Sequence, residues 1–280
     1  MSDATQRAAI AERAARAGGV VARTQFRGEL AVETKADKND LVTETDRESQ
    51  RQVIATISQE YPDATFVCEE ESTPAGVDPA QIDLREAVPE SGRAWVIDPI
   101  DGTSNFVRGM RFWATSVAAV AGGEPVGVAT FLPVMEDLYA AGPESVSLND
   151  STMAVSDRTD PETFAVGLIG WWPARQGDQH VSLFRAATER FGDVRRLGCM
   201  QGVLALVASG SLDAAFMPKT GYPWDTLAGV HLIRRAGGTV TDVHGERWTN
   251  DAEGLVASNG ECHREVLAAV EQGIGVEAAD

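Results

Sequence analysis

The sequence predicts a mixed fold, with an α+β half over residues 1–150 and an α/β half over residues 151–280. Three observations support this. A long alanine-rich helical pattern opens the chain, strand patterns between residues 115 and 141 then follow one another without a helix, and strand and helix patterns alternate after about residue 149. Successive strands favour an antiparallel sheet, whereas alternating strands and helices favour an α/β arrangement.

The two helices expected first have clear signals. Residues 4–26 carry apolar side chains at helical spacing, namely Ile10, Ala14, Ala17 and Val21. A second helix is expected to begin at Thr45, because a threonine followed three residues later by Glu48 has the form of a capping box. It should run to about Glu60 and end before the proline that follows.

The rest of the chain is divided by glycine and proline turns. Residues 65–68 form a short strand pattern that ends in three glutamates, and residues 72–92, rich in proline and charge, predict an exposed excursion. The remaining elements are expected as strands 93–97, 115–121, 126–132, 137–141 and 164–169, helix 179–191, strand 194–197, helix 201–209, strand 212–217, helix 224–236, strands 239–242 and 255–258, and helix 262–272.

Composition excludes several classes of function. The chain has 280 residues and a net charge of −18, and this acidity argues against nucleic acid and anionic membranes as partners. It carries three lysines against 21 arginines, and we hypothesise a halophilic source, where salt screens the self-repulsion. We expect a cytoplasmic protein, because the sequence has no apolar run long enough for a membrane span, no apolar signal-peptide core at its N-terminus and too few cysteines for a disulfide framework.

The stretch WVIDPIDGTSNF, from Trp95 to Phe106, holds the strongest local signal for chemistry. Asp98 and Asp101 should lie close together after a buried strand, and two close carboxylates repel each other unless a cation lies between them. Gly102 permits close backbone approach, and the N–H groups of residues 102–104 can face an anion if a helix begins there. The same residues also fit an ordinary surface turn.

Four further acidic residues, in three stretches, each have an ordinary structural explanation when taken alone. Asp225 precedes an apolar helical pattern and can be a helix N-cap. Glu69 and Glu70 lie in a run of glutamates, which often marks a solvated face. Asp46 can be a first-turn acid that a helix dipole favours.

Four stretches taken together resemble the inositol monophosphatase family, the magnesium-dependent, lithium-sensitive phosphatases. They occur in the family's order and spacing, and the resemblance covers the chain from Lys35 to about Trp248; the stretches are DLVTETD (40–46), CEE (68–70), WVIDPIDGTSNF (95–106) and GYPWDTLAG (221–229). The resemblance implies a layered α-β-α-β-α sandwich, two or three Mg²⁺ ions, inhibition by Li⁺ and a homodimer.

The resemblance also implies roles for individual residues. The metal-binding positions are matched by Glu69, Asp98, Asp101, Asp225 and the carbonyl of Ile100. Thr103 and Asp46 match residues that position or polarise the attacking water, and Lys35 matches a lysine at the mouth of the site. Phosphate and substrate contacts are expected from Gly102, Thr103, Ser104 and Asp225.

The chain departs from the family pattern before its paired glutamates, where Cys68 replaces a glycine. The extra Glu71 leaves the register ambiguous. Glu69 is the preferred ligand because it directly follows the strand, and Glu70 remains the alternative.

The expected function is magnesium-dependent hydrolysis of a small polyol or sugar phosphate by a metal-activated water, with the protein acting as an enzyme. Fructose-1,6-bisphosphatase and histidinol-phosphatase activities remain alternatives, as does a non-enzymatic regulatory protein on the same fold. Pro218 replaces an acid that contacts the inositol ring in relatives, and Lys219 could instead meet a second anionic group. We expect Trp171, Trp172 and residues 198–200 to line the part of the site that binds the substrate.

Overall fold

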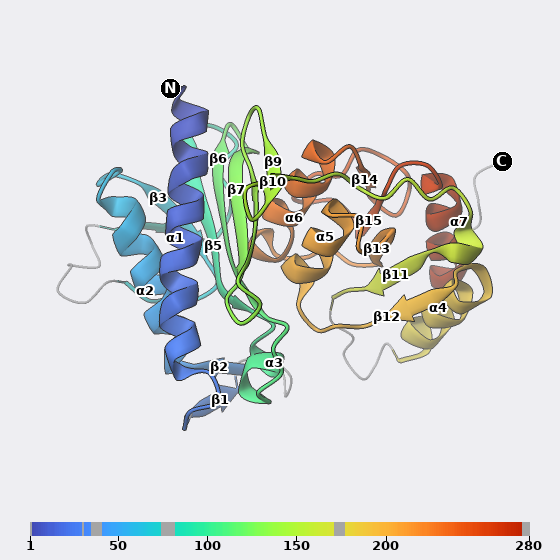
Figure 1. Ribbon diagram of the computed structural model, residues 1–280, viewed down its shortest axis with the longest axis horizontal. Helices are drawn as coiled ribbons and strands as arrows, with labels where there is room; N and C mark the ends of the chain where they lie inside the picture. Colours follow the sequence, from blue (N-terminus) through green and yellow to red (C-terminus); the bar gives the residue numbers. More distant parts are fainter. Residues whose placement is uncertain (1, 30, 35–40, 74–81, 171–176, 276–280) are drawn as a thin grey trace.

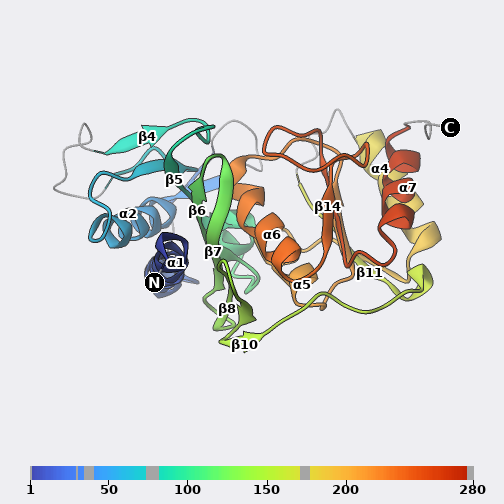
Figure 2. The ribbon, with the colours of Figure 1, turned by 90° about the horizontal axis from the view of Figure 1, so that it is seen from above.

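The computed structural model describes residues 2–29, 31–34, 41–73, 82–170 and 177–275. Over these residues the chain forms helix, sheet, helix, sheet and helix layers (Figures 1 and 2). This arrangement confirms the predicted α-β-α-β-α sandwich. The first helical layer is α1 (Asp3–Gln25) with α2 (Glu44–Ser58), the central one α5 (Met200–Ala208) with α6 (Pro223–Arg235), and the last α4 (Gly177–Arg190) with α7 (His263–Ile274).

The larger sheet has the strand order β10-β9-β8-β7-β6-β5-β3-β4 among the described residues. Its strands are β3 (Thr65–Cys68), β4 (Asp83–Arg85), β5 (Arg93–Asp101), β6 (Ala114–Ala121), β7 (Glu124–Leu132), β8 (Asp137–Ala141), β9 (Val146–Leu148) and β10 (Ser151–Thr152). Strand β3 is parallel to β4 and β5, whereas β5 to β10 are antiparallel. The sequence had not indicated β4, β9 or β10; β4 is exposed and lies within the predicted excursion.

Strand β5 extends beyond the predicted residue 97. Asp98 pairs with Ser116 and Asp101 pairs with Ala114, with a bulge between these two pairs. Inside the bulge, the carbonyl of Pro99 accepts a hydrogen bond of 2.8 Å from the Thr115 hydroxyl. A bulge re-aims side chains at a sheet edge, and here it places both aspartates at the beginning of the short helix α3 (Thr103–Val107).

The smaller sheet is mixed. Its order is β12-β11-β13-β15-β14, with bounds β11 (Ala165–Leu168), β12 (Asp193–Arg195), β13 (Ala214–Met217), β14 (Thr239–Thr241) and β15 (Leu255–Ser258). Strands β12, β11 and β13 are parallel, which is typical of the α/β arrangement predicted for this half, whereas β15 is antiparallel to both neighbours. The division into two domains near residue 150 stays a prediction. Helix α6 contacts both β7 and β14, so the central layer is shared by the two sheets.

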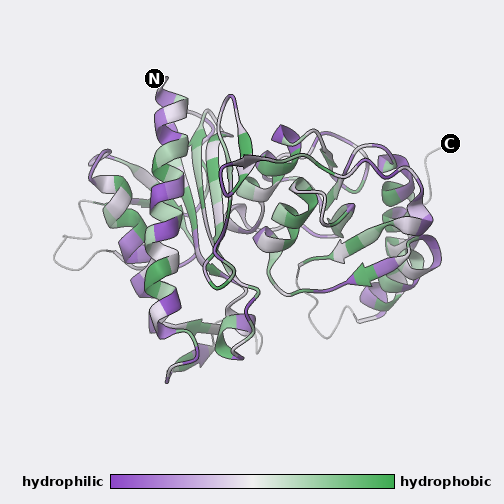
Figure 3. Cartoon of the chain, viewed as in Figure 1, coloured by the Kyte–Doolittle hydropathy of each residue, from purple (hydrophilic) through white to green (hydrophobic). Residues whose placement is uncertain are grey.

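The hydrophobic core lies in the spaces between layers. Val203, Leu204, Val230 and Ile233 are fully buried between the two sheets. In Figure 3 the strands and the central helices are mostly hydrophobic, whereas hydrophilic residues alternate along α1. Of the helices that are described, none is both long and apolar enough to cross a membrane.

Two short strands, β1 (Val32–Thr34) and β2 (Leu41–Thr43), pair just before helix α2 and correct its predicted beginning. The N-cap residue is Thr43, whose backbone is extended, and the predicted cap Thr45 lies inside the helix, 4% exposed. Asp46, not Glu48, occupies the third helical position and accepts a hydrogen bond of 2.8 Å from the Thr43 N–H. The prediction of Thr45 was wrong because both threonines are followed three residues later by an acid.

Candidate active site

Three aspartates from distant parts of the chain converge at one end of the central layer. Asp98 and Asp101 come from the bulged end of β5, and Asp225 lies in the first turn of α6. Each offers one carboxylate oxygen, and these oxygens lie within 4.8 Å of one another. Asp98 and Asp101 are only 2% and 6% exposed, so their charges are largely removed from water.

Asp98 is the least satisfied member of the cluster. Its Oδ1 atom is buried and has no hydrogen-bond partner among the described residues. Burial raises the pKa of Asp98 well above its ordinary value, and the nearby charges of Glu69, Asp101 and Asp225 raise it further. A buried oxygen with a free lone pair, beside other carboxylates, fits a hard divalent cation, which binds oxygen donors.

Asp101 is held by the N-terminus of helix α5. Its Oδ1 accepts from the N–H of Met200 at 2.9 Å, and its Oδ2 accepts from the N–H of Gln201 at 2.5 Å and from the Cys199 thiol at 3.0 Å. Burial raises the pKa of Asp101, and these donors lower it. The helix dipole favours a negative charge at this position, so the second half of the chain orients a carboxylate of the first.

Glu69 and Glu70 occupy different environments. Glu69 follows β3, lines the pocket described below and forms a side-chain hydrogen bond with Asp98. Glu70 is 6% exposed, its N–H donates to the Gln50 side chain at 3.0 Å, and its charge raises the pKa of Asp46. This placement supports Glu69 over Glu70 as the residue that acts with the aspartate cluster.

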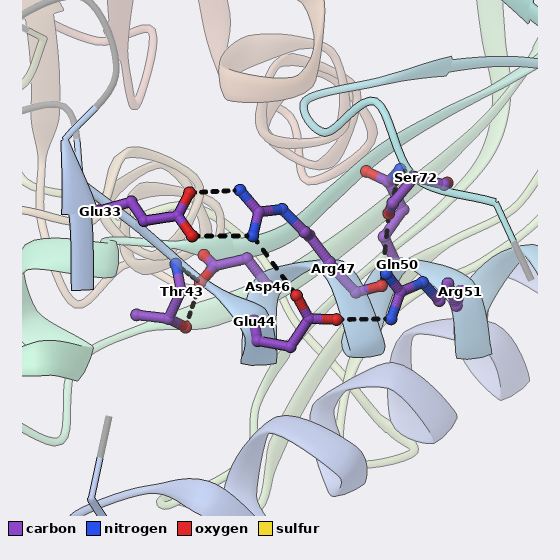
Figure 4. A network of polar contacts seen from close by, with 8 residues as sticks. All are labelled: Glu33, Thr43, Glu44, Asp46, Arg47, Gln50, Arg51 and Ser72. Atoms are coloured by element: carbon purple, nitrogen blue, oxygen red, sulfur yellow. Dashed lines mark hydrogen bonds and ion pairs between the residues drawn. The ribbon is translucent and has the colours of Figure 1, made fainter. Parts of the chain in front are cut away.

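Thr103 and Asp46 lie next to the cluster. The Thr103 hydroxyl is 3.3 Å from Asp46 Oδ1 and 3.0 Å from the carbonyl oxygen of Ile100, and one hydroxyl proton can serve only one of these acceptors at a time. Burial raises the pKa of Asp46 to about 6, although hydrogen bonds from Thr43 oppose the shift. Figure 4 shows this Thr43–Asp46 contact beside the ion pair of Arg47 with Glu33.

Gly102 allows two segments to meet closely. Its φ of +87° lies in the left-handed region, and a Cβ at this position would lie 2.9 Å from the carbonyl oxygen of Gly198. The Asn105 side chain secures the same junction, because its Nδ2 donates to the carbonyls of Phe112 and Leu197, both at 2.7 Å. The segment that carries Thr103 is therefore fixed to the loop that precedes helix α5.

A pocket of about 380 Å³ opens over these residues. The predicted residues that line it are Glu69, Asp98, Ile100, Asp101, Gly102, Thr103, Ser104, Gly198, Cys199, Met200 and Asp225. Asp46 lies behind Thr103 and is not among the lining residues, nor are Pro218 and Lys219. The predictions for Lys35, Trp171 and Trp172 fall outside the described residues.

Six further lining residues had not been predicted: the apolar stretch Leu168, Ile169 and Gly170 at the end of β11, and the polar residues Asn105, Arg108 and Arg196. Asn105 was detectable, since it lies inside the WVIDPIDGTSNF stretch. The two arginines carried no such signal in a chain with 21 of them.

The chain is similar to known proteins over most of its length. Residues 3–274 match the model of the Inositol monophosphatase family. A Thermotoga maritima protein named fructose-1,6-bisphosphatase/inositol-1-monophosphatase is 33% identical over 86% of each chain. A Pasteurella multocida protein named Nus factor SuhB is 32% identical over 92% of this chain and 93% of its own. The solved structure of a Thermotoga maritima IMPase superposes with a TM-score of 0.84 at 27% identity, covering 96% of this chain and 98% of that one.

Proposed function

Since the chain belongs to the inositol monophosphatase family, whose members are metal-dependent phosphatases, we propose that it hydrolyses the phosphate ester of a small polyol or sugar by means of Mg²⁺. One observation carries the proposal: Asp98, Asp101 and Asp225 each offer a carboxylate oxygen within 4.8 Å of the others, and Oδ1 of Asp98 is buried with no partner among the described residues. Such a costly cluster of like charges has a clear use if it holds cations.

The oxygen atoms that would hold the ions come from Glu69, Asp98, Asp101, Asp225 and the carbonyl of Ile100. All are hard donors, which suit Mg²⁺ better than Zn²⁺. When bound, divalent cations lower the pKa of a water molecule and offset the charge that builds up on the phosphate.

Thr103 and Asp46 would orient the attacking water. In the ionised form, Asp46 accepts a hydrogen bond from the Thr103 hydroxyl, which leaves the Thr103 oxygen free to accept a hydrogen bond from water. In the protonated form, Asp46 can itself donate to Thr103. We therefore assign the active state to ionised Asp46, with Thr103 as the contact to the water.

The first turn of α3 would bind the phosphate. Its leading N–H groups have no intrahelical acceptor, and Gly102, Thr103 and Ser104 line the pocket. Gly102 has no side chain to keep a phosphate oxygen from the backbone. Lys35 at the mouth of the site and a homodimer remain parts of the proposal that rest on the family resemblance.

The substrate is proposed to be a small phosphorylated polyol or sugar. The pocket of about 380 Å³ has room for one. Relatives are named inositol-1-monophosphatase and fructose-1,6-bisphosphatase/inositol-1-monophosphatase. Pro218 offers no side-chain acceptor for a ring hydroxyl, which favours a broader specificity than inositol alone.

A phosphate-release panel tests the function. The purified protein is incubated with Mg²⁺ and inositol 1-phosphate, fructose 1,6-bisphosphate or histidinol phosphate, with EDTA and Li⁺ controls. We expect phosphate release that EDTA abolishes and Li⁺ inhibits. Release that persists in EDTA, or no release from any compound, would contradict the proposal.

A regulatory role is the second candidate, because several relatives about 30% identical are named Nus factor SuhB. The same panel distinguishes the two roles. A binding protein that had lost catalysis would release no phosphate. The structure favours the enzyme, because the acids that would hold the metal ions, Asp98, Asp101, Asp225 and Glu69, are all present and adjoin one another.

A further inference from the structure

Two arginines line the same pocket as the carboxylates. Arg108 directly follows helix α3, and Arg196 directly follows strand β12. They are the only basic side chains among the described residues that line the pocket, in a chain whose net charge is −18. Both are exposed, so their guanidinium groups can meet a ligand at the pocket mouth.

The backbones that carry these arginines are fixed to each other. The Asn105 side chain, three residues before Arg108, donates to the carbonyl of Leu197, the residue that follows Arg196, at 2.7 Å. The loop after α3 is held further by the N–H of Met110, which donates to the Asn105 carbonyl at 2.9 Å. Arg108 and Arg196 therefore extend from backbone positions that one contact holds near each other.

Neither arginine forms an ion pair with another described residue. Their sequence neighbour Arg195 behaves differently, because it pairs with Asp193 at 2.7 Å and does not line the pocket. Surface arginines of an acidic protein usually have carboxylates within reach. Arg108 and Arg196 line the pocket and form no ion pair with a carboxylate of another described residue. A guanidinium group binds phosphate with two parallel hydrogen bonds, which makes arginine well suited to anion recognition.

We propose that Arg108 and Arg196 form a second anion subsite, which binds the phosphate that is not cleaved and gives the enzyme a preference for sugar bisphosphates over monophosphates. The inference rests on the proposed function and adds the substrate class. The carboxylate cluster with its cations takes the cleaved phosphate. The arginines, which lie outside that cluster, hold the opposite end of the substrate.

Single Arg108→Gln and Arg196→Gln variants test the subsite, with Arg111→Gln and Arg195→Gln as matched controls from neighbouring exposed positions outside the pocket lining. The measured quantity is kcat/KM for fructose 1,6-bisphosphate and for inositol 1-phosphate in Mg²⁺. Each pocket variant should lose about 10- to 100-fold on the bisphosphate, mainly through KM, since a hydrogen bond to a charged group is worth that factor. Its kcat/KM on the monophosphate, and both values for the controls, should stay close to wild type.

Equal losses on both substrates would overturn the inference, because the arginines would then bind the cleaved phosphate. Unchanged kinetics on the bisphosphate would overturn it too. If the wild-type protein releases no phosphate from either compound, the proposed function fails. The subsite is then decided by calorimetric titration of the same variants with fructose 1,6-bisphosphate and Mg²⁺: weaker binding by Arg108→Gln and Arg196→Gln alone supports it, and unchanged binding refutes it.

Discussion

Asp101 accepts a hydrogen bond of 2.9 Å from the N–H of Met200, which lies 99 residues further along the chain. This contact joins the bulged end of β5 to the first turn of α5. It makes Asp101 part of the central layer's architecture as well as of the carboxylate cluster. Asp98, three residues earlier, is hydrogen-bonded instead to another acid, Glu69, and its Oδ1 has no partner among the residues described.

The two aspartates should therefore respond oppositely to conversion into asparagine. Asp98→Asn removes a buried charge that its neighbours disfavour, so it should raise the melting temperature of the metal-free protein. Asp101→Asn places an amide N–H₂ group against backbone donors of α5, so it should lower the free energy of unfolding by about 1–3 kcal/mol. Thermal melts in EDTA measure both.

Both variants should lose phosphatase activity in Mg²⁺. The loss should exceed the factor of about 10–100 that is typical of residues behind a metal ligand. Asp225→Asn should behave likewise. Near-normal turnover by Asp98→Asn or Asp225→Asn would show that the cluster does not hold the catalytic cations.

Gly102→Ala should harm both stability and activity. Alanine at a φ of +87° is strained, and its Cβ would lie 2.9 Å from the Gly198 carbonyl oxygen. Gly122→Ala is the matched control, because Gly122 also has a positive φ, +61°, but nothing lies within 4 Å of its added Cβ. The free energy of unfolding of the control should fall only by the backbone strain of about 1–2 kcal/mol. That of Gly102→Ala should fall by about 1–3 kcal/mol more, because the added Cβ is also crowded. Phosphatase activity of Gly102→Ala should be at least tenfold lower.

Phosphatase activity should rise with pH through about 6. Burial raises the pKa of Asp46 to about 6, and the ionised carboxylate can only accept from the Thr103 hydroxyl, whereas the protonated form can also donate to it. Below that pH the protonated form dominates, and kcat/KM should fall. A pH–rate profile of the wild type and of Asp46→Asn checks this. The variant should be slow, and its kcat/KM should no longer fall as the pH drops through about 6. If the fall is unchanged in the variant, a group other than Asp46 causes it.

Acid should destabilise the protein through His231. Burial and the charges of Arg235 and Arg234 lower the pKa of His231 to about 4, from an ordinary value of 6.5. The unfolded chain therefore binds a proton more readily than the folded one, and this contribution to stability is lost as pH falls from about 6.5 toward 4. At pH 5 the loss should be about 2 kcal/mol. Urea unfolding measures the free energy of unfolding at pH 8 and at pH 5. The difference between these two values should be smaller for His231→Gln than for wild type.

Salt should stabilise the fold. With 42 acidic and 24 basic residues, the chain repels itself, and mobile ions screen that repulsion. Circular dichroism melts should give a much lower melting temperature in about 0.1 M than in about 3 M KCl, since the screening length falls with ionic strength. An identical melting temperature in dilute buffer would remove the argument for a halophilic source.

Most helices and strands and the order of the acidic motifs could be predicted because their signals are local, whereas the layered sandwich was expected from the family resemblance. Residues 137–141 and 255–258 were predicted with the same bounds as β8 and β15, since alternating or continuous apolar runs between turns mark buried strands. The WVIDPIDGTSNF stretch likewise indicated Asp98 and Asp101 as a cation-binding pair.

Contacts between distant segments could not be predicted in this way. Thr43 caps α2 instead of Thr45 because strand β2 holds Thr43 in an extended conformation, and the sequence motif fits both residues equally. Arg108 and Arg196 share a pocket because the segments that carry them meet across the chain, as in the bond of Asn105 to the carbonyl of Leu197, 92 residues away. Local patterns describe neighbours a few residues apart, whereas the choice of which carboxylates and guanidinium groups face one another depends on how the layers pack.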